Sequence, residues 1–199
     1  MREGSALSAP AFIIETELSH SRLTGLAHMQ YDLFCVKNRI SRTLVAISVI
    51  GIGALYMPAW WSFLLIAYGG YLLTGRYNQA NHTVNQVEKT IEASGLGYPR
   101  DRLEFTPACL RVIPQPAKSS EVTVLRFRDI AGIGEDSENY YIFRDRFGGY
   151  VVPKAALGSR EQEFRDFLEN ASGRHINRPQ IPFLSLRARL RDRYTERKG

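Results

Sequence analysis

Residues 43–75 read TLVAISVIGIGALYMPAWWSFLLIAYGGYLLTG, and none of them is charged. An uncharged apolar run of this length is typical of a segment embedded in a membrane, because a small soluble domain does not need one. A straight helix crosses the hydrocarbon core of a bilayer with about 20 residues. The run has 33 residues, so it is too long for one span and slightly short for two.

A proline near the centre divides this run into two arms. Pro58 ends a helix because it lacks an amide proton and clashes with the preceding turn, and Trp60 and Trp61 favour the interface between lipid and water. We therefore predict a membrane helical hairpin with arms over residues 40–57 and 59–75. Two complete spans, a re-entrant hairpin and a single bent span are the alternatives.

Basic residues flank the apolar run but are absent from its turn. Lys37, Arg39 and Arg42 precede the first arm, and Arg76 follows the second. Positively charged flanks remain on the cytoplasmic side of a membrane. We therefore predict a multi-pass protein of the cell (inner) membrane, with the N-terminus and the C-terminus both cytoplasmic.

Two amphipathic segments, residues 20–42 and 76–94, continue the arms. Apolar residues recur in each at alternating spacings of three and four, which places them on one helix face. We predict that the two helices pair as an antiparallel stalk; the alternative is that each stripe packs on a sheet domain. Gly95 is predicted to end the second helix. The stripes consist of Leu26, Met29, Leu33, Val36 and Ile40 in the first segment and Tyr77, Ala80, Val84, Val87 and Ile91 in the second.

The rest of the chain predicts a small sheet domain. Residues 11–18 alternate in polarity as a strand does, and six further strand candidates follow Gly97. We expect the N-terminal strand to pair with them, which makes the domain over 98–172 discontinuous. A closing helix would start at a capping box of Ser159 and Gln162 and end at Gly173. The six candidates cover residues 103–106, 109–113, 121–127, 130–135, 139–144 and 149–153, and the apolar face of the helix consists of Phe164, Phe167, Leu168 and Ala171.

The predicted fold class is thus an α+β membrane protein with a helical hairpin, a helical stalk and an antiparallel sheet or barrel domain closed by a C-terminal helix. Three local patterns in this order resemble the bacterial YcxB-like membrane protein family. The resemblance covers roughly residues 11–172, and it implies a membrane location and a domain with a pleckstrin-homology-like (PH-like) fold. It supplies no agreed activity and no catalytic residues. The patterns are Arg128-Asp129-Ile130, Tyr140-Tyr141-Ile142-Phe143, and Tyr150-Val151-Val152-Pro153-Lys154 followed by Ser159, Phe164 and Leu168.

No motif for catalysis or metal binding is present in the sequence. The four histidines lack the spacing of a zinc-binding helix, and Ser159 is not in a nucleophile elbow. Gly132-Ile133-Gly134 lacks the third glycine of a phosphate-binding loop. We therefore expect no enzyme activity, no metal and no cofactor. The two cysteines, Cys35 and Cys109, are too few for a disulfide framework.

Two basic features predict contacts with anions. Arg126 and Arg128 are two residues apart, as are Arg144 and Arg146, so each pair lies on one face of a predicted strand. If the two strands are neighbours, four guanidinium groups gather and bind phosphate-bearing headgroups. The alternative, which we favour, is a solvated face balanced by neighbouring acidic residues, namely Asp129, Glu135, Asp136, Glu138 and Asp145.

The second basic feature is the tail. Residues 174–199 contain eight basic and two acidic residues, which accounts for the whole net charge of +6. A helix over its second half would be amphipathic, with its apolar face inserted into the anionic cytoplasmic leaflet. A disordered solvated tail and contact with nucleic acid are the alternatives. The predicted lipid contacts are Phe183, Leu186 and Leu190 on the apolar face, and Arg187, Arg189, Arg191 and Arg193 around it.

These features predict a non-catalytic binding or regulatory domain that is held at a membrane. Its expected partners are the bilayer, with anionic headgroups, and a protein that the sequence does not identify; we do not expect nucleic acid. The rival hypothesis is a structural or assembly protein that forms homo-oligomers through the stalk and hairpin. Substitutions at Val84 and Val87 would disrupt that assembly.

Overall fold

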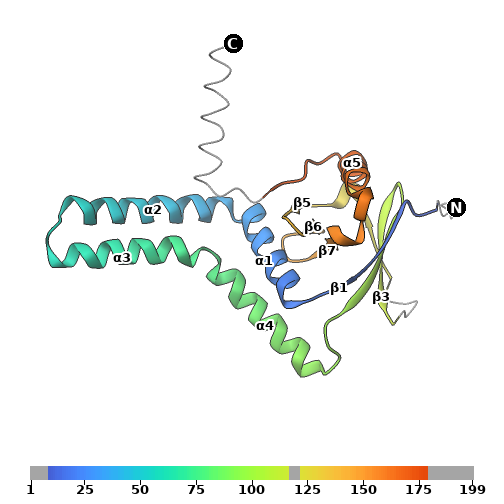
Figure 1. Cartoon of the computed structure of the whole chain (residues 1–199), viewed down its shortest axis with the longest axis horizontal. Helices are drawn as coiled ribbons and strands as arrows, with labels where there is room; N and C mark the ends of the chain where they lie inside the picture. Colours follow the sequence, from blue (N-terminus) through green and yellow to red (C-terminus); the bar gives the residue numbers. More distant parts are fainter. Residues whose placement is uncertain (1–8, 117–121, 179–199) are drawn as a thin grey trace, which may run out of the picture.

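The computed structural model describes residues 9–116 and 122–178. In these residues it shows a mixed α+β protein with five α-helices and two antiparallel sheets (Figure 1). The elements, in chain order, are β1 (Phe12–Glu17), α1 (His20–Phe34), α2 (Val36–Leu55), α3 (Trp60–Thr74), α4 (Asn78–Ser94), β2 (Arg100–Phe105), β3 (Cys109–Gln115), β4 (Thr123–Arg126), β5 (Gly132–Glu135), β6 (Asn139–Phe143), β7 (Gly149–Pro153) and α5 (Glu161–Ser172).

The first sheet joins segments that are far apart in the sequence. Its strand order is β1-β2-β3-β4, and that of the second sheet is β5-β6-β7. β1 pairs antiparallel with β2, with Ile14 opposite Leu103, although four helices separate these strands in the chain. The predicted pairing of the N-terminal strand is therefore confirmed, and the helices form an insertion between the first two strands.

The main core lies between the two sheets and α5. Phe164 of α5 is fully buried, and its ring centroid lies 5.2 Å from that of Phe12 in β1 and 5.0 Å from that of Phe105 in β2. Leu168 is also fully buried, so the predicted apolar face of α5 is confirmed. Gly173 ends this helix with a positive φ of 63°.

The predicted capping box at Ser159 is wrong. The residue that precedes α5 is Arg160, and a 3-10 turn, Gly158–Arg160, contains Ser159. Gln162, the other half of the box, donates instead to Asp166 Oδ1 at 2.8 Å. The N-cap thus lies one residue later than predicted, at Arg160, whose side chain bonds both Glu163 and the carbonyl oxygen of Ala11.

The helix predicted over residues 20–42 is interrupted. α1 ends at Phe34 and α2 begins at Val36, so Cys35 forms an elbow between two differently directed helices (Figure 1). The cause is tertiary. α1 packs along the second sheet, where Met29 joins a cluster with Tyr141 and Phe143, while α2 leaves the sheets to pair with α3.

α1 also lies antiparallel to α4, but the two predicted apolar stripes do not pair with each other as the stalk prediction required. His20 Nδ1 lies 2.5 Å from Glu88 Oε1, and His28 Nε2 lies 2.7 Å from Asn81 Oδ1, so the two helices run in opposite directions. The apolar stripe of α1, however, faces the sheet rather than α4. This stripe covers the large rings of β6, and α4 lies on the side of α1 that carries His20 and His28.

The two valines of α4 differ in burial and therefore provide a test of the stalk. Val84 is 2% exposed and Val87 is 37% exposed. Val84→Asp should lower the free energy of unfolding by about 3 kcal/mol, because it buries a carboxylate without a partner. Val87→Asp should change it by less than about 1 kcal/mol. Thermal unfolding of the purified full chain measures both, and equal effects would contradict the helix pairing described above.

Candidate functional site

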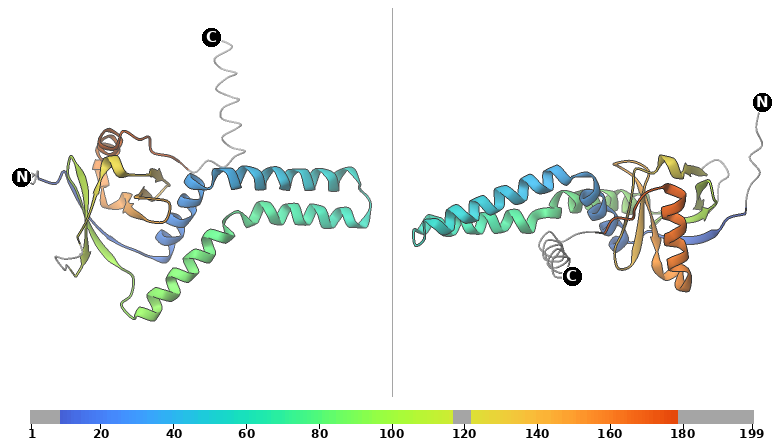
Figure 2. Two further views of the ribbon diagram at one scale, coloured as in Figure 1. Left: turned by 180° about the vertical axis from the view of Figure 1, so that it is seen from behind. Right: turned by 90° about the horizontal axis from the view of Figure 1, so that it is seen from above.

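α2 and α3 lie side by side as a hairpin (Figures 1 and 2), and small residues, together with Ile50, Leu65 and Ile66, lie in their interface. Ala46 and Ser62 are fully buried. A Cβ on Gly53 would lie 3.0 Å from the carbonyl oxygen of Ser62, and one on Gly69 would lie 3.0 Å from that of Ala46. The two backbones thus approach closely at two places, which are seven residues, or about two turns, apart along each helix.

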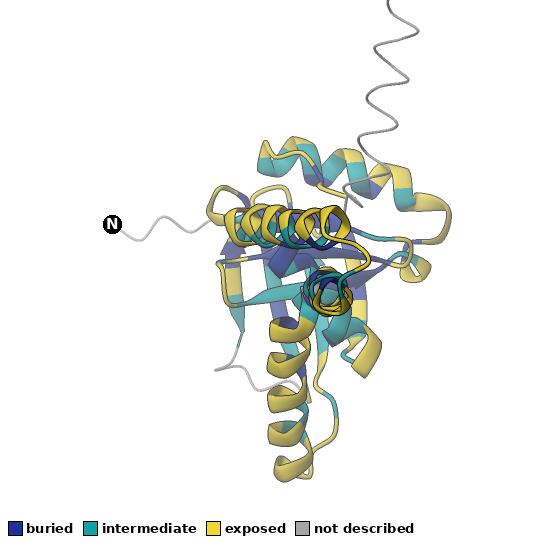
Figure 3. Ribbon diagram, turned by 90° about the vertical axis from the view of Figure 1, so that its left-hand side faces the viewer, coloured by how far each residue is buried: buried dark blue, intermediate teal, exposed yellow. Residues whose placement is uncertain are grey.

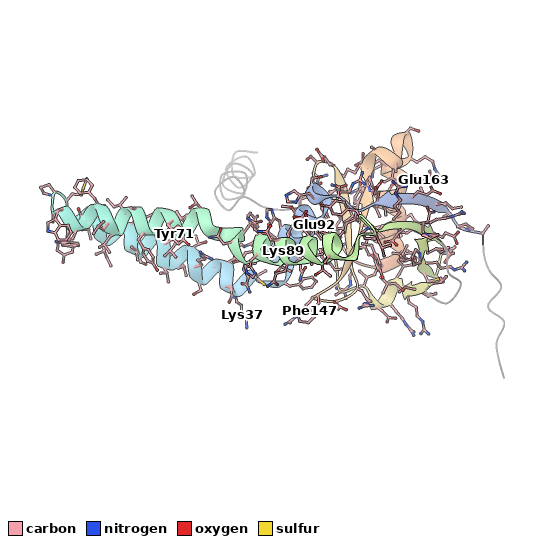
Figure 4. All side chains as sticks on the ribbon, turned by 90° about the horizontal axis from the view of Figure 1, so that it is seen from below. Lys37, Tyr71, Lys89, Glu92, Phe147 and Glu163 are labelled. Atoms are coloured by element: carbon pink, nitrogen blue, oxygen red, sulfur yellow. The ribbon has the colours of Figure 1, made fainter. Side chains whose placement is uncertain are left out.

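Large apolar side chains cover the outside of the same hairpin. They are mostly exposed, as the yellow end-on helices in Figure 3 show, and Tyr71 is one of them (Figure 4). In a water-soluble hairpin the large apolar residues would face inward and the polar residues outward. The reverse order, with small residues inside, is characteristic of helices packed in lipid. The outward residues include Leu44, Val45, Ile47, Ile52, Leu55, Phe63, Leu64, Tyr68 and Tyr71.

The turn of the hairpin lies at the end that is farthest from the sheets (Figure 1). α2 ends at Leu55 and α3 begins at Trp60, so the predicted turn around Pro58 is confirmed. Trp60 is exposed, and the ring of Trp61 lies 5.3 Å from that of Tyr56. The aromatic groups thus cluster at the tip.

Basic residues occupy the opposite end, which we call the hairpin base. Lys37 and Arg39 lie in the first turn of α2, and Figure 4 shows Lys37 at the domain end of the hairpin. Arg42 Nε donates to the carbonyl oxygen of Leu72 at 3.1 Å and so ties α2 to the end of α3. Asp32 is buried beside the base, where it accepts a hydrogen bond from Tyr77 Oη at 3.0 Å and lies 3.5 Å from Arg39.

The two helices of the hairpin differ in length. Among the described residues, α2 is the one helix long and apolar enough to cross a membrane. α3 has 15 residues and rises about 22 Å, against about 30 Å for the hydrocarbon core. Two antiparallel helices do not match the predicted alternative of a single bent span, and α3 is shorter than a complete span requires.

A buried carboxylate, Glu135, fixes the chain beyond α5. Its side chain is 1% exposed and meets three cations from separate segments: Arg165 and Arg178 at 2.6 Å and Lys154 at 3.0 Å. Burial alone would raise the pKa of Glu135, but hydrogen bonds from Arg178, Lys154 and Arg165 outweigh it and lower the pKa to about 2. The sequence analysis had placed Glu135 on a solvated face. Its position at the end of an apolar strand was the available signal for burial.

The segment after α5 runs back along β5 to the hairpin base (Figure 1). Asn177 donates its backbone N–H to Ile133 O at 2.9 Å and accepts from Glu135 N at 2.8 Å, and Ile176 is buried in the core. Ile176 and Arg178 line a cavity whose other lining residues include Asp32, Val36 and Arg39. The basic tail therefore begins beside the base of the hairpin.

The structure does not gather the four arginines of the predicted anion patch. Arg126 ends β4 in the first sheet, whereas Arg144 follows β6 in the second, so their strands are not neighbours. Arg128 lies in a 3-10 turn and pairs with Asp129 at 3.7 Å, and Arg144 pairs with Asp145 at 3.0 Å. In these two pairs each arginine is balanced by a neighbouring carboxylate, as in the solvated face that the sequence analysis gave as the alternative.

The predicted lipid contacts of the tail, Phe183, Leu186, Leu190, Arg187, Arg189, Arg191 and Arg193, lie outside the described residues. Within residues 9–116 and 122–178, no group of three histidine, cysteine or acidic side chains is placed to hold a metal ion. A cleft of about 560 Å³ opens between the start of α1 and the β5–β6 turn. It is lined by Arg22, Glu138 and Lys154 among others, and its described lining includes neither histidine nor cysteine.

Comparisons of the chain with protein-family models, with curated proteins and with solved structures found no match. The resemblance to YcxB-like proteins therefore stays a prediction from the sequence.

Proposed function

We propose that this chain is a membrane-anchored protein whose hairpin inserts into the bilayer and holds a non-catalytic binding or regulatory domain at its surface. One observation carries the proposal: the hairpin buries small residues and exposes large apolar ones. Each Leu, Ile or Phe side chain transferred from water to lipid contributes roughly 1.5–3 kcal/mol. The outward face therefore strongly favours lipid over water.

Charge distribution supports one orientation in the membrane. Lys37, Arg39 and Arg42 lie at the base, next to the sheet domain, while the tip contains aromatic residues and no charge. Because basic flanks remain cytoplasmic, we place the base, the sheets and both termini in the cytoplasm of the cell that makes the protein. Insertion from one side of the inner membrane requires the hairpin alone to enter the lipid.

The order of strands supports a PH-like domain. Seven strands form sheets of four and three, and a C-terminal helix packs its buried Phe164 and Leu168 into the core between them. We propose that this domain binds a protein or anionic headgroups, and that tail residues such as Arg187 and Arg191 contact the anionic leaflet. The tail begins at the hairpin base, so tethering raises the local concentration of lipid around it.

One observation weakens the stalk part of the rival hypothesis, which is assembly through the stalk and hairpin. Val84 is already buried where α4 packs on α1 within one chain. Of the predicted stalk contacts on α4, Val87 remains partly exposed. No observation on the described residues favours assembly over a membrane anchor.

A charge on the hairpin tests the proposed anchor. Leu64 in α3 is 61% exposed and Val124 in β4 is 56% exposed, so the two side chains are similarly exposed within the chain. A charged residue at the centre of a membrane helix costs about 2.5–3.5 kcal/mol. Leu64→Asp should therefore increase the amount of protein in the alkaline extract relative to the wild-type chain, whereas Val124→Asp should not. Full extraction of the wild-type chain would refute the anchor.

A further inference from the structure

A groove runs between α1 and the segment after α5 and ends at the hairpin base. It consists of two adjoining cavities of about 460 and 350 Å³, and Leu33 and Asn177 line both of them. Met29, Leu33 and Val36 form an apolar wall on one side. Ile176 and Asn177 form the other side.

Cations outnumber anions around this groove. Arg39, Arg174 and Arg178 line it, with Asp32 as its acidic residue. Asp32 is buried, accepts a hydrogen bond from Tyr77 Oη and lies 3.5 Å from Arg39 Nη1, so it offsets part of the positive charge of Arg39. Arg178 binds Glu135 through Nε, and its side chain is 68% exposed. Arg174 is exposed and holds the carbonyl oxygen of Ala131 at 3.1 Å.

The groove thus combines an apolar wall with a cationic opening at the level where the proposed membrane surface meets the protein. An anionic phospholipid has the matching chemistry, because its phosphate is negative and its glycerol and acyl parts are apolar. A free anion would use the arginines but would leave the wall of Leu33 and Val36 exposed to water.

We propose that this groove binds one anionic phospholipid of the surrounding leaflet. Its phosphate lies between Arg39 and Arg178, with Arg174 at the rim, and the start of its acyl chains covers Leu33 and Val36. This proposal rests on the membrane anchor proposed above. It assigns a lipid site to residues that are separate from the basic tail after residue 178.

The test measures binding of a fluorescent phosphatidylglycerol to the full-length protein in neutral detergent micelles, with phosphatidylcholine as the comparison lipid. Removing one cation near an anionic headgroup should weaken binding about fivefold. The Arg174→Gln variant should therefore bind phosphatidylglycerol about fivefold more weakly than the wild-type chain. The variant with both Arg39→Gln and Arg178→Gln should bind it about twentyfold more weakly. The matched control carries both Arg126→Gln and Arg128→Gln, since these two arginines are exposed on another part of the domain. Its affinity for phosphatidylglycerol should fall by less than about twofold.

Four results would overturn the proposed site. They are equal binding of the two lipids, unchanged affinity in the groove variants, an equal loss in the control, and complete displacement by inorganic phosphate at matched ionic strength. The last result would identify a free anion as the ligand. Alkaline extraction of the same variants distinguishes the two proposals: groove variants that lose lipid binding must remain in the membrane pellet. If the wild-type chain itself were extracted, the anchor would be wrong as well.

Discussion

Replacing Glu135 with glutamine should lower the free energy of unfolding by about 3–5 kcal/mol. The substitution keeps the shape of the side chain but removes the negative charge that Lys154, Arg165 and Arg178 share in a buried position. Uncompensated cations then remain, and three segments lose their common partner. Glu163→Gln is the matched control, because Glu163 is an exposed carboxylate (Figure 4). It pairs with Arg160, and loss of this surface pair should have little effect.

The same carboxylate predicts how stability depends on pH. The pKa of Glu135 is lowered from 4.5 to about 2 in the folded protein, so its contribution is complete above pH 4.5 and is lost as the pH falls towards about 2. The shift corresponds to about 3 kcal/mol. Thermal unfolding of the wild-type protein should show this loss on acidification. The Glu135→Gln variant should lack that part of the acid dependence, and parallel pH profiles would contradict the prediction.

Replacing Gly69 with leucine should separate α2 from α3. A Cβ at this position overlaps Ile50 Cγ1 and lies 3.0 Å from the carbonyl oxygen of Ala46, so the helices must move apart. Forcing extra atoms into such an interface costs about 1–3 kcal/mol, and the leucine side chain adds more than a Cβ. We expect a loss of at least about 3 kcal/mol, measured as a lower melting temperature in detergent micelles.

Gly70 provides the control for this substitution. It is the next residue in the same helix, and a Cβ on it meets no atom within 4 Å. Gly70→Leu adds the same apolar volume on the outward face, where it should leave the melting temperature unchanged or raise it. Similar losses in both variants would mean that helix propensity or expression, rather than the close approach of α2 and α3, determines the result.

Local patterns in the sequence were sufficient to predict most elements. The alternation of residues 12–17 predicts β1, the glycines at 95 and 173 mark the ends of α4 and α5, and the face of Phe164 and Leu168 predicts what α5 buries. The two arms of the hairpin follow from an uncharged run broken at Pro58. These features depend on periods of two or 3.6 residues and on single residues with strong backbone preferences, which act over a few positions.

Tertiary structure decided several of the contacts between these elements. Whether Arg126 and Arg144 are neighbours depends on the sheet that each strand joins, and the elbow at Cys35 depends on the surface that α1 must cover. The cations around Glu135 come from positions 154, 165 and 178, and the groove joins α1 to the segment after α5. Such contacts link residues that are far apart in the chain. Their physical basis is long-range packing of large side chains and compensation of buried charge, which no local spacing in the sequence records.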